Sequence, residues 1–210
     1  MVNTAGRQVL RYCLDAVARE AATVPFATEV LVLDNASADD SAEVARRHAA
    51  SARVIAVAAR RDRDESATEL LRRAGGRTCL LLTEASELEP GATHALHDAL
   101  AADAGAAAAG ATLVRPDGTR LPSAWRFPGP VSTALRALGL QQRLVQSAGD
   151  RVRAVDWAPT AALLVRRDAA ERVGWLRGGE AAFCRRLRDA GWRVLHVPEA
   201  RAVLPLDSPA

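Results

Sequence analysis

The sequence predicts an α/β fold in which helices flank a sheet of mainly parallel strands. Short, continuous apolar runs, typical of buried parallel strands, occur at 29–34, 53–57 and 78–82. Segments with apolar residues at helical spacing alternate with these runs. The alternation is typical of right-handed crossovers between neighbouring parallel strands. In such sheets, ligands bind at the carboxyl ends of the strands, so we expect Asp34 and the segment 83–87 to border the ligand site.

Each helix of the first half has a signal of its own. Leu10, Cys13 and Leu14 repeat at helical spacing in the first helix. Gly75-Gly76 ends the third helix, and Pro90 opens the fourth. A loop rich in cap residues precedes the second helix. The four helices are expected at 7–20, 41–50, 65–74 and 90–103.

The second half carries less regular signals. No element is predicted for a stretch of small residues at 104–109. A hairpin is expected at 111–121, because Pro116 and the Asp117-Gly118 pair are strong turn residues. The remaining elements are expected as an extended segment at 122–130, helices at 131–146, 168–173 and 180–190, strands at 161–165 and 192–197, and a coil after Pro198.

Composition fits one globular domain over 1–210, and the charge pattern argues against nucleic-acid binding. The chain has 210 residues, 49% hydrophobic and 25% charged, with a formal net charge of +3. Its arginines alternate with acidic residues, as at 60–65, which is typical of a solvated face. Aromatic residues make up only 4%, too few for a base-stacking platform.

The cysteine pattern excludes a zinc or redox motif. Cys13, Cys79 and Cys184 lie far apart, each in an apolar run, and no CxxC pair occurs. We therefore expect buried, reduced thiols. No apolar run reaches the roughly 18 residues of a spanning helix, and the N-terminus lacks a signal-peptide pattern.

Six segments together resemble a family of glycosyltransferases. They are VNTAGR (2–7), EVLVLDNASADDSAEV (29–44), LLLTEASELEPGA (80–92), VRPDGT (114–119), VDWAPTAALLVRRDA (155–169) and CRRLRDAGWRVLHVPEAR (184–201). In this order they are similar to family 2 glycosyltransferases with the GT-A fold, of the bacterial rhamnosyltransferase-like kind that serves cell-wall or polysaccharide biosynthesis. The resemblance implies a mixed sheet flanked by helices, with a nucleotide-sugar-binding half at 1–103 and an acceptor-binding half at 104–210.

The resemblance places a nucleotide at the loop after the strand 29–34. It implies that Asn3, Asp34, Asn35 and Ser37 bind the nucleotide of a UDP-, dTDP- or GDP-linked sugar, with Asp34 accepting a hydrogen bond from the base. A carboxylate at a strand end can accept from a ring N–H. Alternatively, Asp34, Asn35 and Ser37 cap the helix that follows. One loop can both cap a helix and bind a nucleotide.

The acid that binds the metal ion in this family is missing. Mg²⁺ or Mn²⁺ is typical of the family, but the matching position is Ala85, whose methyl group cannot coordinate a cation. Glu84 is the candidate to replace that ligand, although neighbouring side chains of an extended segment point in opposite directions. Glu87 and Glu89 are expected at a helix start, where they favour the helix dipole. No metal cofactor is therefore expected.

The catalytic base position is altered as well. Glu180 falls where the family has its catalytic Asp, and Ala182 replaces a second acid. A glutamate can deprotonate an acceptor hydroxyl if its reach and pKa suit the task, and the alternative is an ordinary glutamate at a helix start. The resemblance also implies acceptor-binding roles for Asp156, Trp157 and Thr160.

Further family features are missing. The segment after 198–201 lacks the family's histidine, and His196 lies within a predicted strand, where we expect it to pack or to lie on the surface. The segment 62–69 lacks the family's glycine and asparagine residues. The first family strand is reduced to Met1-Val2, so either residues are missing upstream or the sheet is rearranged.

These changes leave different functions open. An active transferase would use Glu180 as base, Asp34 to hold the nucleotide, and an arginine such as Arg60 or Arg77 to neutralise the diphosphate in place of a metal. Its acceptor would be a glycan or a lipid-linked glycan. A catalytically degenerate member would bind a nucleotide sugar or act as a scaffold, for example beside a partner glycosyltransferase. An unrelated nucleotide-binding α/β protein would have no need of the hairpin at 111–121. The resemblance and the absent signal peptide imply a cytoplasmic protein, either free or peripheral at the inner face of the membrane.

Overall fold

The computed structural model describes residues 1–4 and 6–205. The helices are α1 (Arg7–Thr23), α2 (Ser41–Arg47), α3 (Arg63–Arg73), α4 (Ala92–Ala102), α5 (Pro130–Ala137), the 3₁₀ helix η1 (Gln141–Leu144), α6 (Arg167–Arg172) and α7 (Gly179–Asp189). The strands are β1 (Val2–Asn3), β2 (Leu31–Asp34), β3 (Arg53–Ala56), β4 (Thr78–Leu82), β5 (Glu87–Leu88), β6 (Ala106–Val114), β7 (Arg153–Val155), β8 (Ala162–Arg166) and β9 (Arg193–Val203).

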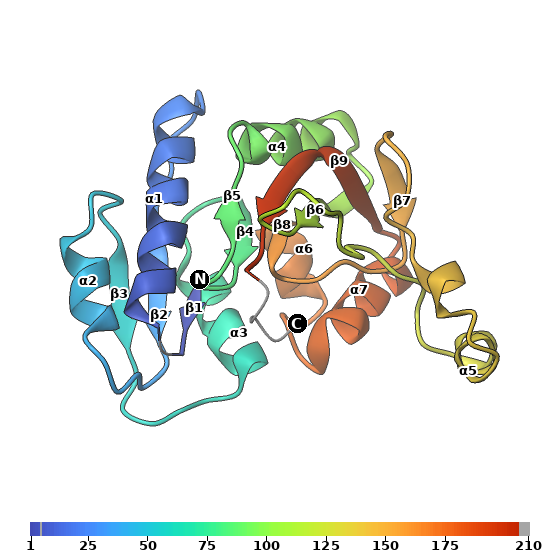
Figure 1. Ribbon diagram of the computed structural model, residues 1–210, viewed down its shortest axis with the longest axis horizontal. Coiled ribbons are helices and arrows are strands. Elements are labelled where there is room, and N and C mark those ends of the chain that lie inside the picture. The colour runs from blue at the N-terminus through green and yellow to red at the C-terminus, as the bar shows by residue number, and fades with distance from the viewer. Residues whose placement is uncertain (5, 206–210) are drawn as a thin grey trace.

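Two sheets meet near the centre of the molecule (Figure 1). A parallel sheet has the order β1-β2-β3, and a mixed sheet has the order β4-β8-β6-β9-β5, with β7 beside β9. A parallel bridge between Val2 and Thr83 joins β1 to the end of β4. The first strand is therefore short, but it lies between β2 and β4, so the rearranged sheet that was one of the two alternatives does not occur.

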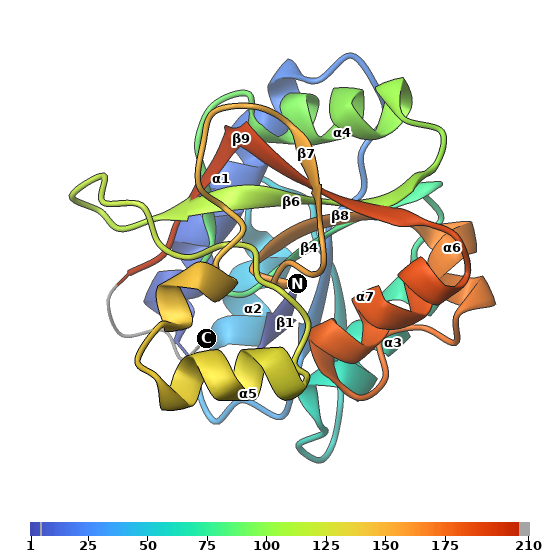
Figure 2. The same ribbon diagram turned by 90° about the vertical axis from the view of Figure 1, so that its right-hand side faces the viewer.

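Alternating side chains along the strands supply two hydrophobic cores. In β2, Val32 packs on the face covered by α1 and α4, whereas Leu33 packs on the face covered by α3, α6 and α7. Leu82 and Leu81 of β4 divide in the same way. This period of two is the reason why continuous apolar runs form strands buried on both faces. Figure 2 shows α4 on one side of β6 and β9 and α7 on the other.

The stretch of small residues at 104–109, for which no element was predicted, leads into the central strand β6. Every residue of Ala106–Val114 is buried. Alanines give little strand signal, but their small size lets neighbouring segments approach the sheet. At Gly110 an added Cβ would lie 2.6 Å from the Cβ of Ala158. The missing side chain thus makes room for the segment that leads to Thr160.

Two element boundaries in the second half differ from the prediction. The helix expected over 131–146 ends at Ala137, because Gly139 adopts a left-handed backbone with φ of 70°. The strand expected to end before Pro198 continues to Val203. The pairing of β9 with β6 jumps from Val197 to Arg201, so Pro198 lies in an irregularity where it interrupts no ladder hydrogen bond with β6.

The start of α4 also differs from the prediction. Glu87 lies in the short strand β5 rather than at a helix start, and Glu89 precedes the helix, which begins at Ala92. The buried carboxylate of Glu20 in α1 takes the capping role: it accepts hydrogen bonds from the amides of Gly91 (2.8 Å) and Thr93 (2.7 Å). A long-range contact of this kind has no signature in the local sequence.

The hairpin follows the prediction, and so do two of the three cysteines, which were all expected to be buried. All three thiols are free, with Cys13 and Cys184 buried and Cys79 half-buried. Burial raises the pKa of Cys13 to about 12. The turn at 115–118 is closed by a hydrogen bond from the amide of Gly118 to the carbonyl of Arg115 (2.9 Å). No helix in the described residues is long and apolar enough to span a bilayer.

His196 is packed within β9 and should make stability depend on pH. It is fully buried, and burial, together with the charges of Arg153 and Arg120, lowers its pKa to about 4. Among the described residues, the hydroxyl of Thr112 lies 3.4 Å from Nε2 of His196. Above pH 6.5 the ring is neutral in both states, and as the pH falls from 6.5 towards 4 only the unfolded chain gains the proton. The free energy of unfolding should therefore fall by about 2 kcal/mol at pH 5.

Denaturant unfolding of wild type and His196→Gln between pH 7 and pH 4 measures the contribution of His196 to the free energy of unfolding. Between pH 7 and pH 5, the free energy of unfolding should fall by about 2 kcal/mol less in the variant than in wild type. Parallel pH profiles for the two proteins would contradict it.

Candidate functional site

The loop after β2 holds a buried carboxylate. Asp34 is 6% exposed, and its Oδ1 accepts hydrogen bonds from Nδ2 of Asn3 (3.0 Å) and from the hydroxyl of Ser37. Asn3, at the end of β1, is fully buried, whereas Ser37 is partly exposed. The structure thus brings together three of the residues predicted to bind the nucleotide, with Asn3 and Ser37 fixing the orientation of Asp34.

Asn35, the fourth of these residues, binds the backbone of the loop between β3 and α3. Its Nδ2 donates to the carbonyl of Arg61 (2.9 Å), and its Oδ1 accepts from the amide of Arg61 (2.8 Å). Asn35 is 2% exposed, so its amide group is committed to this reciprocal pair. It therefore fixes the loop that leads into α3.

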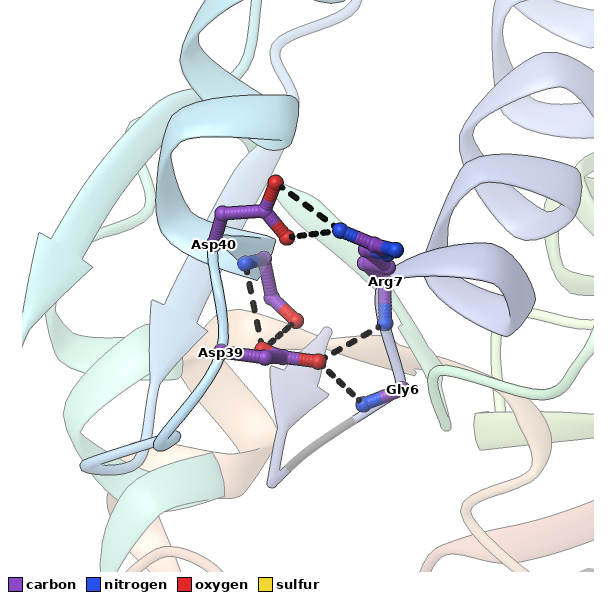
Figure 3. Close-up of polar contacts among 5 residues, drawn as sticks. Gly6, Arg7, Asp39 and Asp40 are labelled. Atoms are coloured by element: carbon purple, nitrogen blue, oxygen red, sulfur yellow. Dashed lines mark hydrogen bonds and ion pairs between the residues drawn. The ribbon is translucent and has the colours of Figure 1, made fainter.

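Asp39, rather than Asp34, Asn35 or Ser37, performs the capping that the sequence left open (Figure 3). Its Oδ2 accepts from the amides of Gly6 and Arg7 at the start of α1, both at 3.1 Å. Its Oδ1 accepts from the amide of Ser41 at the start of α2 (3.1 Å). The hydroxyl of Ser41 and the amides of Gly6 and Arg7 lower the pKa of Asp39 to about 2. One carboxylate therefore holds two helix starts together.

The position that matches the family's metal ligand does not provide a metal site. Ala85 is buried, and Glu84 binds the hydroxyl of Thr4 through Oε1 (2.7 Å). The segment is a turn, closed by the amide of Ser86 and the carbonyl of Thr83 (3.2 Å), and not the extended stretch that the sequence argument assumed. In the described part of the chain, no three His, Cys, Asp or Glu side chains form a group that could hold a metal ion. The residues present therefore do not fit a bound divalent cation.

Glu180 is the second residue of α7 and is bound to Thr160. Its Oε1 accepts from both the amide (2.9 Å) and the hydroxyl (2.6 Å) of Thr160. The structure thus pairs the predicted base with one of the predicted acceptor-binding residues. Glu180 is only partly buried, which leaves its second oxygen able to act on a hydroxyl brought to it.

The starts of α3 and α7 are also connected. Oδ2 of Asp64 accepts from the amide of Gly179 (2.6 Å). Burial raises the pKa of Asp64, and the charges of Asp62 and Glu180 act in the same direction, while the hydrogen bond from Gly179 opposes them. This contact fixes the position of Glu180 relative to α3.

A narrow pocket lies among these elements. It is lined by side chains from the ends of β1 and β4, from α3, and from the segment before β8. Its polar members are Thr4, Arg63, Thr83, Glu84 and Thr160. Thr160, which binds Glu180, lines this pocket, and Asn3, which binds Asp34, directly precedes the lining residue Thr4 in the chain.

Asp156 and Trp157 take a different position from Thr160. Asp156 accepts from the amide of Phe127 (2.8 Å), and Trp157 stacks on Trp125 with ring centroids 4.6 Å apart. These contacts hold the segment 125–127 in place. The prediction of acceptor contacts at Asp156 and Trp157 thus depends on an acceptor that reaches this segment.

Sequence reasoning missed Thr4, Arg63 and Asp64. Thr4 lay inside a segment used only for the resemblance. Arg63 and Asp64 lay inside a run of alternating charges interpreted as a solvated face. Their roles arise from contacts between distant segments, such as Asp64 with Gly179, and the only local signal was the start of a helix.

Comparison with known proteins identifies the fold. No protein-family model and no curated protein matches the sequence. Among solved structures, S. aureus TarS 1-349 in complex with UDP-GlcNAc matches with a TM-score of 0.69 and 10% identity, covering 100% of this chain and 58% of that chain. The mannosyltransferase PcManGT from Pyrobaculum calidifontis with GDP-Man and Mn²⁺ matches with a TM-score of 0.66 and 18% identity, covering 96% of this chain and 54% of that chain.

A third structure, GalNAc-T7 with UDP, GalNAc and Mn²⁺, matches with a TM-score of 0.62 and 12% identity, covering 84% of this chain and 37% of that chain. The chain therefore spans between 37% and 58% of the length of these proteins. At such identities the likeness shows the fold alone. That fold is the GT-A fold of nucleotide-sugar glycosyltransferases.

Proposed function

We propose that this chain is a glycosyltransferase of the family 2, rhamnosyltransferase-like kind, with the nucleotide-sugar site in residues 1–103 and the acceptor site in 104–210. It binds a nucleotide-diphosphate sugar and transfers the sugar to a hydroxyl of a glycan or lipid-linked glycan, on the cytoplasmic side of a membrane or free in the cytoplasm. The observation that carries the proposal is the position of two hydrogen-bonded pairs: Thr160, which binds Glu180, lines the pocket at the carboxyl ends of β1 and β4, and Asn3, which binds Asp34, directly precedes the lining residue Thr4.

The proposed roles follow from exposure and bonding. Asp34, with Ser37, contacts the nucleotide base, while Asn3, through its bond to Asp34, and Asn35, through its bonds to Arg61, position the loop. Glu180 accepts the proton of the acceptor hydroxyl, and Thr160 holds the carboxylate that does so. No step of this reaction is assigned to a metal ion, because the residues at the matching position do not fit one.

A second function is favoured by a specific observation. Oε1 of Glu180 already accepts two hydrogen bonds from Thr160, which is also the arrangement of a structural carboxylate at a helix start. With Ala85 at the metal position, this favours a nucleotide-sugar-binding protein without catalysis. Binding of a donor without any transfer or hydrolysis would establish that alternative.

Nucleotide binding through Asp34 can be tested with a matched pair of variants. Asp34→Asn keeps the shape and the bond from Asn3 but removes the charge, so the affinity for a nucleoside should fall about 10- to 100-fold. Asp40→Asn makes the same chemical change at an exposed residue of the same loop and should leave the affinity unchanged.

Isothermal titration with uridine, thymidine and guanosine measures both variants, and their melting temperatures verify folding. Wild-type affinity in Asp34→Asn would show that Asp34 does not contact the base. An equal loss in both variants would indicate a general effect of loop charge.

A further inference from the structure

Arg63 is the basic side chain that lines the pocket. It is the first residue of α3, it is exposed, and it shares the pocket with Thr4, Glu84 and Thr160. Within the described residues, its guanidinium makes no ion pair and no hydrogen bond to another side chain. An arginine without a carboxylate partner keeps all of its donors for an anion.

The backbone on both sides of Arg63 is anchored. Two residues before it, Arg61 is held by the reciprocal hydrogen bonds of Asn35 (2.9 and 2.8 Å). One residue after it, Asp64 holds the amide of Gly179 (2.6 Å). Arg63 therefore projects from a segment tied to the loop of Asp34 at one end and to the start of α7 at the other.

The two arginines suggested by the sequence are placed less well. Arg77 directly precedes β4, at the opposite end of that strand from Thr83 and Glu84. Arg60 is exposed in the loop before α3 and does not line the pocket.

We infer that Arg63 binds the diphosphate of the donor nucleotide and supplies positive charge where no metal ligand is present; this inference rests on the proposed function. A guanidinium can form two parallel hydrogen bonds to phosphate oxygens, so one side chain both neutralises the phosphate charge and fixes its orientation. Glu84 on the pocket wall accepts a hydrogen bond from the hydroxyl of Thr4 and keeps its negative charge, so Arg63 is the lining side chain that can attract an anion.

The experiment compares nucleosides with nucleoside diphosphates in EDTA. Uridine, thymidine, guanosine and their diphosphates are titrated into wild type, Arg63→Ala, Arg63→Lys and the control Arg77→Ala. We expect Arg63→Ala to lose at least about 10-fold in affinity for the diphosphate, with the affinity for the matching nucleoside unchanged. Arg63→Lys should recover part of the loss, because it restores the charge without the bidentate geometry. Arg77→Ala should behave as wild type.

The outcomes separate the inference from the proposed function. If wild type binds nucleotides and Arg63→Ala still prefers the diphosphate to the nucleoside, the role of Arg63 is overturned and the proposed function stands. An equal loss in Arg63→Ala and Arg77→Ala also overturns it, because net charge would then explain the effect. A wild type that binds none of these compounds overturns the proposed function, and the inference with it.

Discussion

Glu180→Gln is expected to reduce sugar transfer by about 10²- to 10⁴-fold, the usual contribution of a general base. The glutamine Oε1 can still accept from the amide and hydroxyl of Thr160, so the geometry of the site should persist. What is lost is the ability to accept the acceptor's proton. Release of nucleoside diphosphate from the bound donor sugar, with water or a simple glycoside as acceptor, measures the rate.

Donor affinity serves as the control for this variant and should equal that of wild type. An unchanged rate in Glu180→Gln would remove Glu180 from the reaction. If wild type binds the donor but releases no diphosphate with any acceptor, the non-catalytic alternative holds.

Gly110→Ala is expected to lower the free energy of unfolding by about 3 kcal/mol, at the upper end of what overpacking costs. The new Cβ would lie 2.6 Å from the Cβ of Ala158, and both atoms are attached directly to backbone, so neither can rotate away. The strain falls on the segment that carries Thr160. Equilibrium unfolding in denaturant measures the loss.

Gly129→Ala is the matched control for Gly110→Ala. No heavy atom lies within 4 Å of its added Cβ, so the same substitution should be neutral or stabilise by about 0.4–1 kcal/mol. Similar stabilities for the two variants would show that Gly110 is not needed for the close approach.

The first half of the fold could be predicted because its strands carry strong local signals. The run at 78–82 coincides with β4, and 53–57 differs from β3 by one residue. The start of β6 was not predicted because alanine has a low strand propensity, and Ala106–Ala109 are buried by close packing in the folded chain. The continuation of β9 past Pro198 escaped it because a proline is tolerated where the register of a ladder shifts.

The candidate site was predictable only as far as the resemblance reached. It proposed Asp34, Glu180 and Thr160 as site residues, and the structure joins Glu180 to Thr160, which lines the pocket. The partners that orient them come from distant segments, and so does the pocket position of Arg63. The local sequence does not predict these contacts, because each one joins residues that are distant in the sequence and meet only in the folded sheet.

The central claim is that a nucleotide sugar binds at the carboxyl ends of β1, β2 and β4 without a metal ion held by the protein. Thermal unfolding with UDP-, dTDP- and GDP-sugars, each with Mn²⁺ and with EDTA, tests it most directly. At 100 times its Kd a bound donor adds about 2.7 kcal/mol, or roughly 5–10 °C for a chain of this size. We predict such a shift with at least one donor, equal in Mn²⁺ and in EDTA. No shift with any donor, or a shift that requires Mn²⁺, would contradict the claim.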